Sequence, residues 1–323
     1  MMQDVNLTRR ELMKLGGILA VGAALPATTA EVFAEGARKL LTTTRIVWIQ
    51  AQSCTGDSVS LLNSVDPDPV ELLTRFVSLV AHQTIGAAQG KTFLDALDKA
   101  REQGEYILVI EGSLPLDMPQ ACMIGESTVE ELLLKLVPRA KAIVAVGTCA
   151  AFGGMPAADG NQTGAAGVSQ FMAKHHLPIQ GRLINCPSCP THPKCLIGTL
   201  AYVASKGYPQ VDPDLLTPTM FYGHSTHDEC PRYHYYERKI FAKYLGDQHG
   251  CLFELGCLGP ISYTECPHRQ WNTGVNWCIR ASAPCIGCSS PHFGKRKDFP
   301  FYRKGEHQHA VAYTEQDRKG GRP

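Results

Sequence analysis

The sequence has almost no net charge and no long run of basic residues. Its 323 residues include 31 Lys and Arg against 30 Asp and Glu, which gives a net charge of +1. The longest basic run is Lys295-Arg296-Lys297. Proteins that bind nucleic acids concentrate positive charge because they must neutralise phosphates. We therefore expect no nucleic-acid partner.

The sequence also lacks an apolar run long enough to cross a membrane. The longest, Leu15 to Leu25, has 11 residues, whereas a spanning helix needs about 20. It follows Thr8-Arg9-Arg10-Glu11-Leu12-Met13-Lys14 and precedes a small-residue cleavage point at Val32-Phe33-Ala34. This pattern is typical of a twin-arginine export signal. We expect residues 1–34 to direct export to the periplasm or the outer face of the cytoplasmic membrane. An amphipathic first helix and an uncleaved anchor are the alternatives.

Cysteine is abundant, and its 13 occurrences are an odd number that disulfides alone would leave unpaired. Exported proteins ordinarily use cysteine for disulfides. The twin-arginine route, however, carries proteins already folded in the cytoplasm, where metals can be inserted between reduced thiols. The signal and the cysteines together favour metal sites over disulfides.

Residues 44 to about 205 alternate between short apolar runs and longer helical patterns. This alternation predicts an α/β domain with a parallel sheet covered by helices on both faces. Acidic first turns mark helices that open at Pro69–Leu73 and Val129–Leu134. The predicted strands are Arg45–Gln50, Tyr106–Ile110, Ala142–Val146 and the short Leu183–Ile184.

Residues with chemical function follow each predicted strand directly. Cys54-Thr55-Gly56-Asp57 follows the first strand, Glu111-Gly112 the second, and Gly147-Thr148-Cys149 the third. Cys186-Pro187-Ser188-Cys189-Pro190 follows the fourth. Ligands of parallel sheets bind beyond the carboxyl ends of the strands. We therefore expect the three cysteine-bearing loops to meet at one edge of the sheet.

From residue 219 onwards neither the helical nor the strand period persists, so we divide the chain into domains at 44–218 and 219–323. The second segment holds eight soft ligands within 62 residues, enough for two tetrahedral centres. Cys-x-x-Cys spacing serves both zinc and iron–sulfur sites, so the spacing leaves both open. The eight are His227, Cys230, Cys251, Cys257, Cys266, Cys278, Cys285 and Cys288.

The order of residues around these cysteines resembles the small subunit of [NiFe] hydrogenases. The resemblance rests on Cys251–Pro260 (CLFELGCLGP), Cys285-Ile286-Gly287-Cys288, Cys54-Thr55-Gly56, Gly147-Thr148-Cys149-Ala150 and Cys189-Pro190-Thr191-His192-Pro193. It covers about residues 44 to 303. It implies a flavodoxin-like domain followed by an irregular cluster-binding domain. It also implies three iron–sulfur clusters that conduct electrons from a nickel–iron site held by a separate large subunit.

The resemblance assigns the ligands motif by motif, and it implies a [4Fe-4S] cluster at each of three positions. At Cys278 many relatives have proline and a three-iron medial cluster, so cysteine here predicts a fourth iron. Cys186 is expected to be a small buried apolar residue, and Cys122 a family cysteine that binds nothing. The proximal set is Cys54, Asp57, Cys149 and Cys189; the distal set is His227, Cys230, Cys251 and Cys257; the medial set is Cys266, Cys278, Cys285 and Cys288.

Asp57 stands where most of the family has cysteine, and the chain resembles a subgroup with aspartate at the proximal cluster. We expect the carboxylate to bind iron, because a carboxyl group is already ionised at neutral pH, whereas a thiol must first lose its proton. The alternative is that Asp57 caps a helix beginning near Ser58, which would leave a [3Fe-4S] proximal cluster. Extra cysteines that mark an oxygen-tolerant proximal cluster would fall at Gly56 and Gly154, so we expect no such cluster.

The resemblance implies the electron-transfer subunit of an exported hydrogenase that oxidises H₂. It would act in a heterodimer, or a dimer of heterodimers, and pass electrons to a cytochrome or quinone-linked acceptor. Two other functions stay open. One is another exported iron–sulfur electron-transfer subunit, similar to the cluster subunit beside the quinone site of respiratory complex I. The other is a binding protein stabilised by zinc or disulfides.

Overall fold

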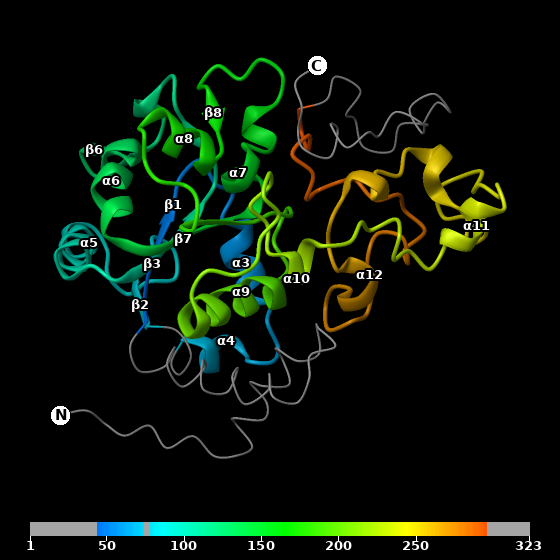
Figure 1. Ribbon diagram of the computed structural model, residues 1–323, viewed down its shortest axis with the longest axis horizontal. Coiled ribbons are helices and arrows are strands. Elements are labelled where there is room, and N and C mark those ends of the chain that lie inside the picture. The colour runs from blue at the N-terminus through cyan, green and yellow to red at the C-terminus, as the bar shows by residue number, and fades with distance from the viewer. Residues whose placement is uncertain (1–43, 74–77, 296–323) are drawn as a thin grey trace.

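A computed structural model describes residues 44–73 and 78–295, so the predicted signal at 1–34 lies outside the described residues. Figure 1 shows two parts side by side: a layered part of strands and helices, and a smaller part of loops and short helices. In the described ranges no helix has the length and hydropathy to span a bilayer.

The layered part contains a five-stranded parallel sheet with the order β2-β1-β3-β7-β9. Numbered along the chain, this order is 2-1-3-4-5, as in flavodoxin-like folds. The four predicted strands are confirmed, and β2 is an additional edge strand that the sequence did not reveal. The strands are β1 (Arg45–Gln50), β2 (Ser78–Ala81), β3 (Tyr106–Glu111), β7 (Ala140–Val146) and β9 (Leu183–Cys186).

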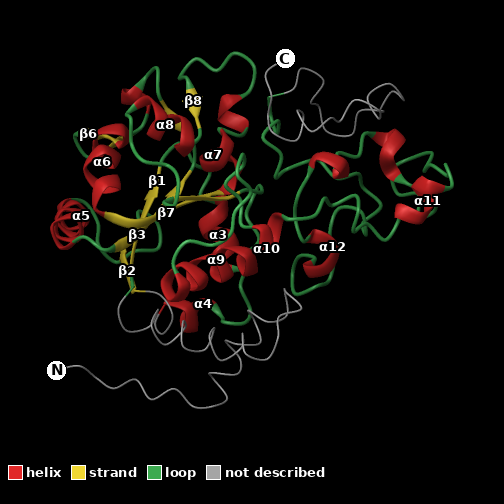
Figure 2. Ribbon diagram, in the orientation of Figure 1, coloured by secondary structure: helices red, strands yellow, loops and turns green. Residues whose placement is uncertain are grey.

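Helices cover both faces of this sheet (Figure 2), as the uniformly apolar strands predict. Alternate residues of a strand point to opposite faces. Leu108 of β3 therefore packs with α5 (Lys91–Gln103), α6 (Val129–Leu136) and α8 (Val168–Lys174). Its neighbour Val109 packs with α9 (Pro193–Lys206) on the other face.

Local signals account for where several helices begin. Thr128 and Glu131 form a capping box at the start of α6, which confirms the helix predicted there. The other predicted helix, Pro69–Leu73, begins as α4 (Pro69–Glu71), is capped by Asp68, and continues as a π-helical turn at Leu72 and Leu73. Two short helices follow strands: α3 (Gly56–Leu62) begins after a loop of residues 51–55 beyond β1, and α7 (Gly147–Phe152) starts directly after β7. Small two-stranded ladders join β4 (Leu114–Pro115) to β8 (Ala165–Ala166) and β5 (Met123–Ile124) to β6 (Ser127–Thr128).

The smaller part is irregular and includes α10 (Thr219–Tyr222), α11 (Tyr233–Glu237) and α12 (Cys266–Arg269). Its buried apolar cluster is small, and two of its members are Cys257 and Cys285. Cysteine side chains therefore occupy positions where a larger domain would place apolar residues.

Candidate metal centres

The first group of predicted ligands gathers at the carboxyl edge of the sheet. Cys54 precedes α3, Asp57 lies in its first turn, Cys149 lies in α7, and Cys189 follows β9. Burial raises the pKa of the Cys149 thiol to about 11, and the charges of Asp57 and Cys54 contribute. Burial also raises the pKa of Cys189 to about 12, with contributions from Cys149, Asp57 and Cys54. All four side chains are thus close enough to influence one another electrostatically.

Two glycines leave room beside the sulfur atoms of this group. A Cβ on Gly56 would lie 2.9 Å from Cys54 Sγ, and a Cβ on Gly154 would lie 2.7 Å from Cys149 Sγ. The family resemblance predicts that the extra cysteines of an oxygen-tolerant cluster would fall at these same two positions. A side chain at either position would meet the neighbouring sulfur directly, so the glycines keep the space beside Cys54 Sγ and Cys149 Sγ open.

Asp57 does not cap α3, so the capping interpretation of this residue is wrong. The N-cap is Thr55, whose own side chain makes no capping hydrogen bond, and the Asp57 and Ser58 amides donate to Glu111. The Asp57 carboxylate instead accepts a hydrogen bond at Oδ1 from the Thr191 amide, 2.6 Å away. Burial raises its pKa to about 7, although the Thr191 hydrogen bond opposes the shift. A nearby cation would be needed to keep so buried a carboxyl group fully ionised.

Glu111, at the end of β3, holds the segment that carries Cys54 and Asp57. The residue is fully buried, and its carboxylate accepts from side chains and amides of the β1–α3 segment. Both carboxylate oxygens take part, so this one side chain fixes the segment at several points. The donors are Trp48 Nε1 (3.0 Å), Gln50 Nε2 (3.2 Å), Ser53 Oγ (3.0 Å), Asp57 N (3.1 Å), Ser58 N (3.4 Å) and Ser58 Oγ.

A second group lies in the smaller part of the molecule and contains Cys230, Cys251, Cys257 and His227. Burial raises the pKa of Cys257 to about 12, and the charges of Cys251 and Cys230 contribute. The His227 ring packs edge-on against Tyr236 of α11, with ring centroids 4.6 Å apart. Burial lowers the pKa of His227. A neutral imidazole is the form that binds metals.

A third group lies between the other two and contains Cys266, Cys278, Cys285 and Cys288. Burial raises the pKa of Cys266 to about 12, and the charges of Cys288 and Cys278 contribute. Burial likewise raises the pKa of Cys285, with contributions from Cys257 and Cys288.

Direct contacts connect the three groups in a row. Ser188, next to Cys189, has its Oγ 3.3 Å from Cys288 Sγ. At the other side of the middle group, the Cys285 amide donates to Cys257 Sγ across 3.4 Å. The middle group therefore touches both of its neighbours.

The donor chemistry fits iron–sulfur clusters. All 13 cysteines are unpaired thiols, and thiolates are the usual ligands of such clusters. Within residues 44–73 and 78–295, no three His, Cys, Asp or Glu side chains converge enough to hold one metal ion. Ligands of a cluster bind separate irons and need not converge on a single point.

Comparison with known proteins separates the two parts of the chain. Residues 54–203 match the family model "NADH ubiquinone oxidoreductase, 20 Kd subunit". Residues 222–302 match the family model of the C-terminal region of the NiFe/NiFeSe hydrogenase small subunit. The first family model also describes subunits of respiratory NADH oxidoreductases, the alternative considered above. The second match therefore distinguishes a hydrogenase small subunit from that alternative.

Full-length relatives agree with the second match. The periplasmic [NiFeSe] hydrogenase small subunit of Desulfomicrobium baculatum is 38% identical, over 92% of this chain and 99% of the relative. The periplasmic [NiFe] hydrogenase small subunit 1 of Nitratidesulfovibrio vulgaris is 37% identical, over 92% and 93%. The chain belongs to the small-subunit family of [NiFe] and [NiFeSe] hydrogenases. It is the electron-transfer subunit of a heteromeric hydrogenase.

The fold agrees with that of a solved hydrogenase. A crystal structure of the H₂-activated [NiFeSe] hydrogenase of D. baculatum contains a chain that matches with a TM-score of 0.75 and 38% identity. The match covers 81% of this small subunit and 99% of that chain. The α/β fold with its added C-terminal domain is therefore confirmed.

Sequence reasoning brought together the cysteines but missed the residues that hold them. It noted Glu111 only as following a strand, and it assigned no role to Thr191 or Gly147. The signal for Glu111 was an acid directly after a wholly apolar strand, Tyr106–Ile110. Cys186 is fully buried, as expected of a small apolar residue.

Proposed function

We propose that this small subunit holds three iron–sulfur clusters in a row and conducts electrons through them during H₂ oxidation. The contacts of Cys288 with Ser188 and of Cys285 with Cys257 carry this proposal, because they bring the three ligand groups into one continuous path. When bound, the clusters supply one-electron carriers. The chain's own residues keep these carriers close together and partly shielded from water.

We assign the first group as the proximal cluster, the middle group as the medial and the His227 group as the distal, each as [4Fe-4S]. The proximal ligands are Cys54, Asp57, Cys149 and Cys189. The medial ligands are Cys266, Cys278, Cys285 and Cys288. The distal ligands are His227, Cys230, Cys251 and Cys257. The division at residue 218 then separates the proximal cluster from the other two.

The partner and location follow from the same assignment. Cys54 and Cys189 are exposed in the isolated small chain, so a large subunit bearing the nickel–iron site would cover them. We propose a heterodimer, or a dimer of heterodimers, that is exported by the twin-arginine route. It would act in the periplasm or at the outer membrane face and reduce a cytochrome or a quinone-linked acceptor. The names of the periplasmic relatives support this location.

Purification of the untagged protein from its native membrane and periplasmic fractions tests the proposal. A larger nickel-containing chain should co-purify, and the complex should be brown and oxidise H₂. A colourless complex that contains zinc would contradict it.

Asp57→Ala and Asp57→Cys test the unusual proximal ligand. Oδ1 accepts from the Thr191 amide, 2.6 Å away, and a carboxylate has a second oxygen with which it can bind iron. Asp57→Ala should remove one iron per molecule, whereas Asp57→Cys should keep all the irons and change the Mössbauer spectrum of the proximal cluster. Oxygen matches a soft iron–sulfide core less well than thiolate does, so the cysteine variant should hold that iron more firmly. H₂ oxidation is measured before and after exposure to air.

If both Asp57 variants keep the iron content and proximal spectrum of the parent, Asp57 binds no iron and serves only as an acceptor for Thr191. The aspartate subgroup would then be the wrong comparison.

Cys278→Pro should convert the medial cluster to a three-iron form. Proline offers no thiolate, and an iron without its protein ligand is easily lost. The oxidised variant should show a three-iron EPR signal and contain one iron fewer than the parent. Cys122→Ala serves as the control, because Cys122 belongs to none of the three groups. Unchanged iron and EPR in the proline variant would show that Cys278 is not a ligand.

A further inference from the structure

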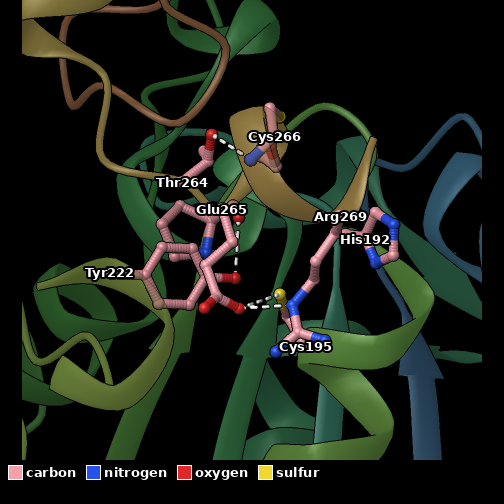
Figure 3. A pocket seen from close by; sticks show the side chains of 9 residues that line it. His192, Cys195, Tyr222, Thr264, Glu265, Cys266 and Arg269 are labelled. Carbon is pink, nitrogen blue, oxygen red and sulfur yellow. Dashed lines mark hydrogen bonds and ion pairs between the residues drawn. The ribbon is translucent and has the colours of Figure 1, made fainter. Parts of the chain in front are cut away.

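A buried ion pair lies beside the middle group, at its junction with the proximal loop. Glu265 immediately precedes Cys266, and Arg269 ends the single turn of α12. Arg269 Nε donates to Glu265 Oε2. The side chains of Arg269 and Glu265 are only 5% and 17% exposed. Figure 3 shows Glu265 and Arg269 at a small cavity that Cys195 and His192 also line.

Little water can screen these charges. The cavity has a volume of about 10 Å³, which admits at most one water molecule. The guanidinium of Arg269 also stacks over the Phe221 ring, 5.4 Å from its centroid. Cys195 Sγ lies 4.0 Å from the Glu265 oxygen. In such surroundings a single unpaired charge acts more strongly on its neighbours than it would in water.

Cys195 and Tyr222 at the cavity are uncharged at neutral pH, because burial raises the pKa of both groups, and His192 is uncharged as well. Burial lowers the pKa of His192 to about 4, and Arg269 contributes to that shift. Burial raises the pKa of Glu265, and the Arg269 guanidinium opposes the shift. The cavity thus holds one cation and one anion that offset each other, at the edge of the medial group.

We propose that the Glu265–Arg269 pair sets the reduction potential of the medial cluster by keeping its surroundings electrically balanced. The inference rests on the proposed assignment of Cys266, Cys278, Cys285 and Cys288 as ligands. Reduction adds one electron to the cluster, so a nearby net positive charge favours the reduced state and a net negative charge opposes it. Local charge is one of the factors that control such potentials.

Two substitutions at this pair should move the potential in opposite directions. Glu265→Gln leaves the positive charge of Arg269 unpaired and should raise the medial midpoint potential. Arg269→Gln leaves the negative charge of Glu265 unpaired and should lower the medial midpoint potential, measured at pH 8. Potentials are read by EPR during redox titration of the whole enzyme. The distal cluster should keep its potential and act as an internal reference.

Asp95→Asn is the matched control, because Lys91 and Asp95 form an exposed ion pair with the same four-residue spacing. It should leave all three potentials unchanged. Shifts of the same sign in Glu265→Gln and Arg269→Gln would indicate altered packing and overturn the proposal. An unchanged medial potential in both would also overturn it. If one variant does not fold, the sign of the shift in the other still decides, since zero or reversed shift contradicts the proposal.

The parent enzyme separates this proposal from the function on which it rests. A parent without a medial cluster would refute the ligand assignment. If the parent contains a medial cluster whose potential is the same in both variants, only the role of the ion pair is refuted.

Discussion

Glu111→Gln is expected to lower the free energy of unfolding by about 3 kcal/mol and to cause loss of iron from the proximal cluster. A hydrogen bond to a charged group contributes about 1.5–3 kcal/mol, and a buried donor left without an acceptor costs a similar amount. The glutamine nitrogen would face donors from the β1–α3 segment in place of an acceptor. Cys54 and Asp57 would then lose their fixed positions.

Calorimetry and iron analysis of the purified heteromer measure both effects of Glu111→Gln. Glu131→Gln is the control, because Glu131 completes the capping box of α6 and glutamine serves equally well there. The control should unfold at nearly the parent temperature with all its iron. If Glu111→Gln behaves like this control, the hydrogen bonds to Glu111 do not position the proximal segment.

Gly147→Ala is expected to cost about 2–5 kcal/mol, because backbone strain and steric collision add at this position. Its φ of +80° lies in the left-handed region, where an L residue costs about 1–2 kcal/mol. A Cβ there would lie 2.1 Å from Asp57 Oδ2, and such overpacking costs a further ~1–3 kcal/mol. The carboxylate would be displaced, so proximal iron should also fall. Thermal unfolding and iron content measure the two effects.

Gly160→Ala isolates the strain from the collision. Gly160 has a φ of +89°, and apart from Gly160 and its two chain neighbours no described residue has an atom within 4 Å of the position that a Cβ would take. The substitution should cost only the conformational part, about 1–2 kcal/mol. In the double variant with Asp57→Ala, Gly147→Ala should no longer cost the part of the unfolding free energy that comes from the collision with Asp57. Equal costs for the Gly147 and Gly160 variants would show that Asp57 does not press against Gly147.

The strands were predictable because each is a short apolar run whose burial on both faces needs no polar alternation. Tyr106–Ile110 shows this well, since all of β3 is buried. The edge strand Ser78–Ala81 was not predicted, because it is short and only partly buried. Helix α6 was predictable from its capping residues, which act within one turn. The helix expected at Pro69–Leu73 is likewise found: α4 covers Pro69–Glu71, and helical backbone continues through Leu73 as a π-helical turn.

The sequence by itself determined which residues can bind metal, since the residue types and spacings of Cys285-Ile286-Gly287-Cys288 and the other motifs are local properties. Only the tertiary structure decided how those residues are held. A helix cap was the alternative interpretation of Asp57, but its carboxylate accepts from Thr191, 134 positions away in sequence. Glu111 reaches back more than 50 residues to the segment that carries Cys54. Glu265 and Arg269 are neighbours on one turn, yet their burial depends on packing against Phe221 and Cys195. Contacts over such separations depend on the packing of whole elements, and no local pattern records them.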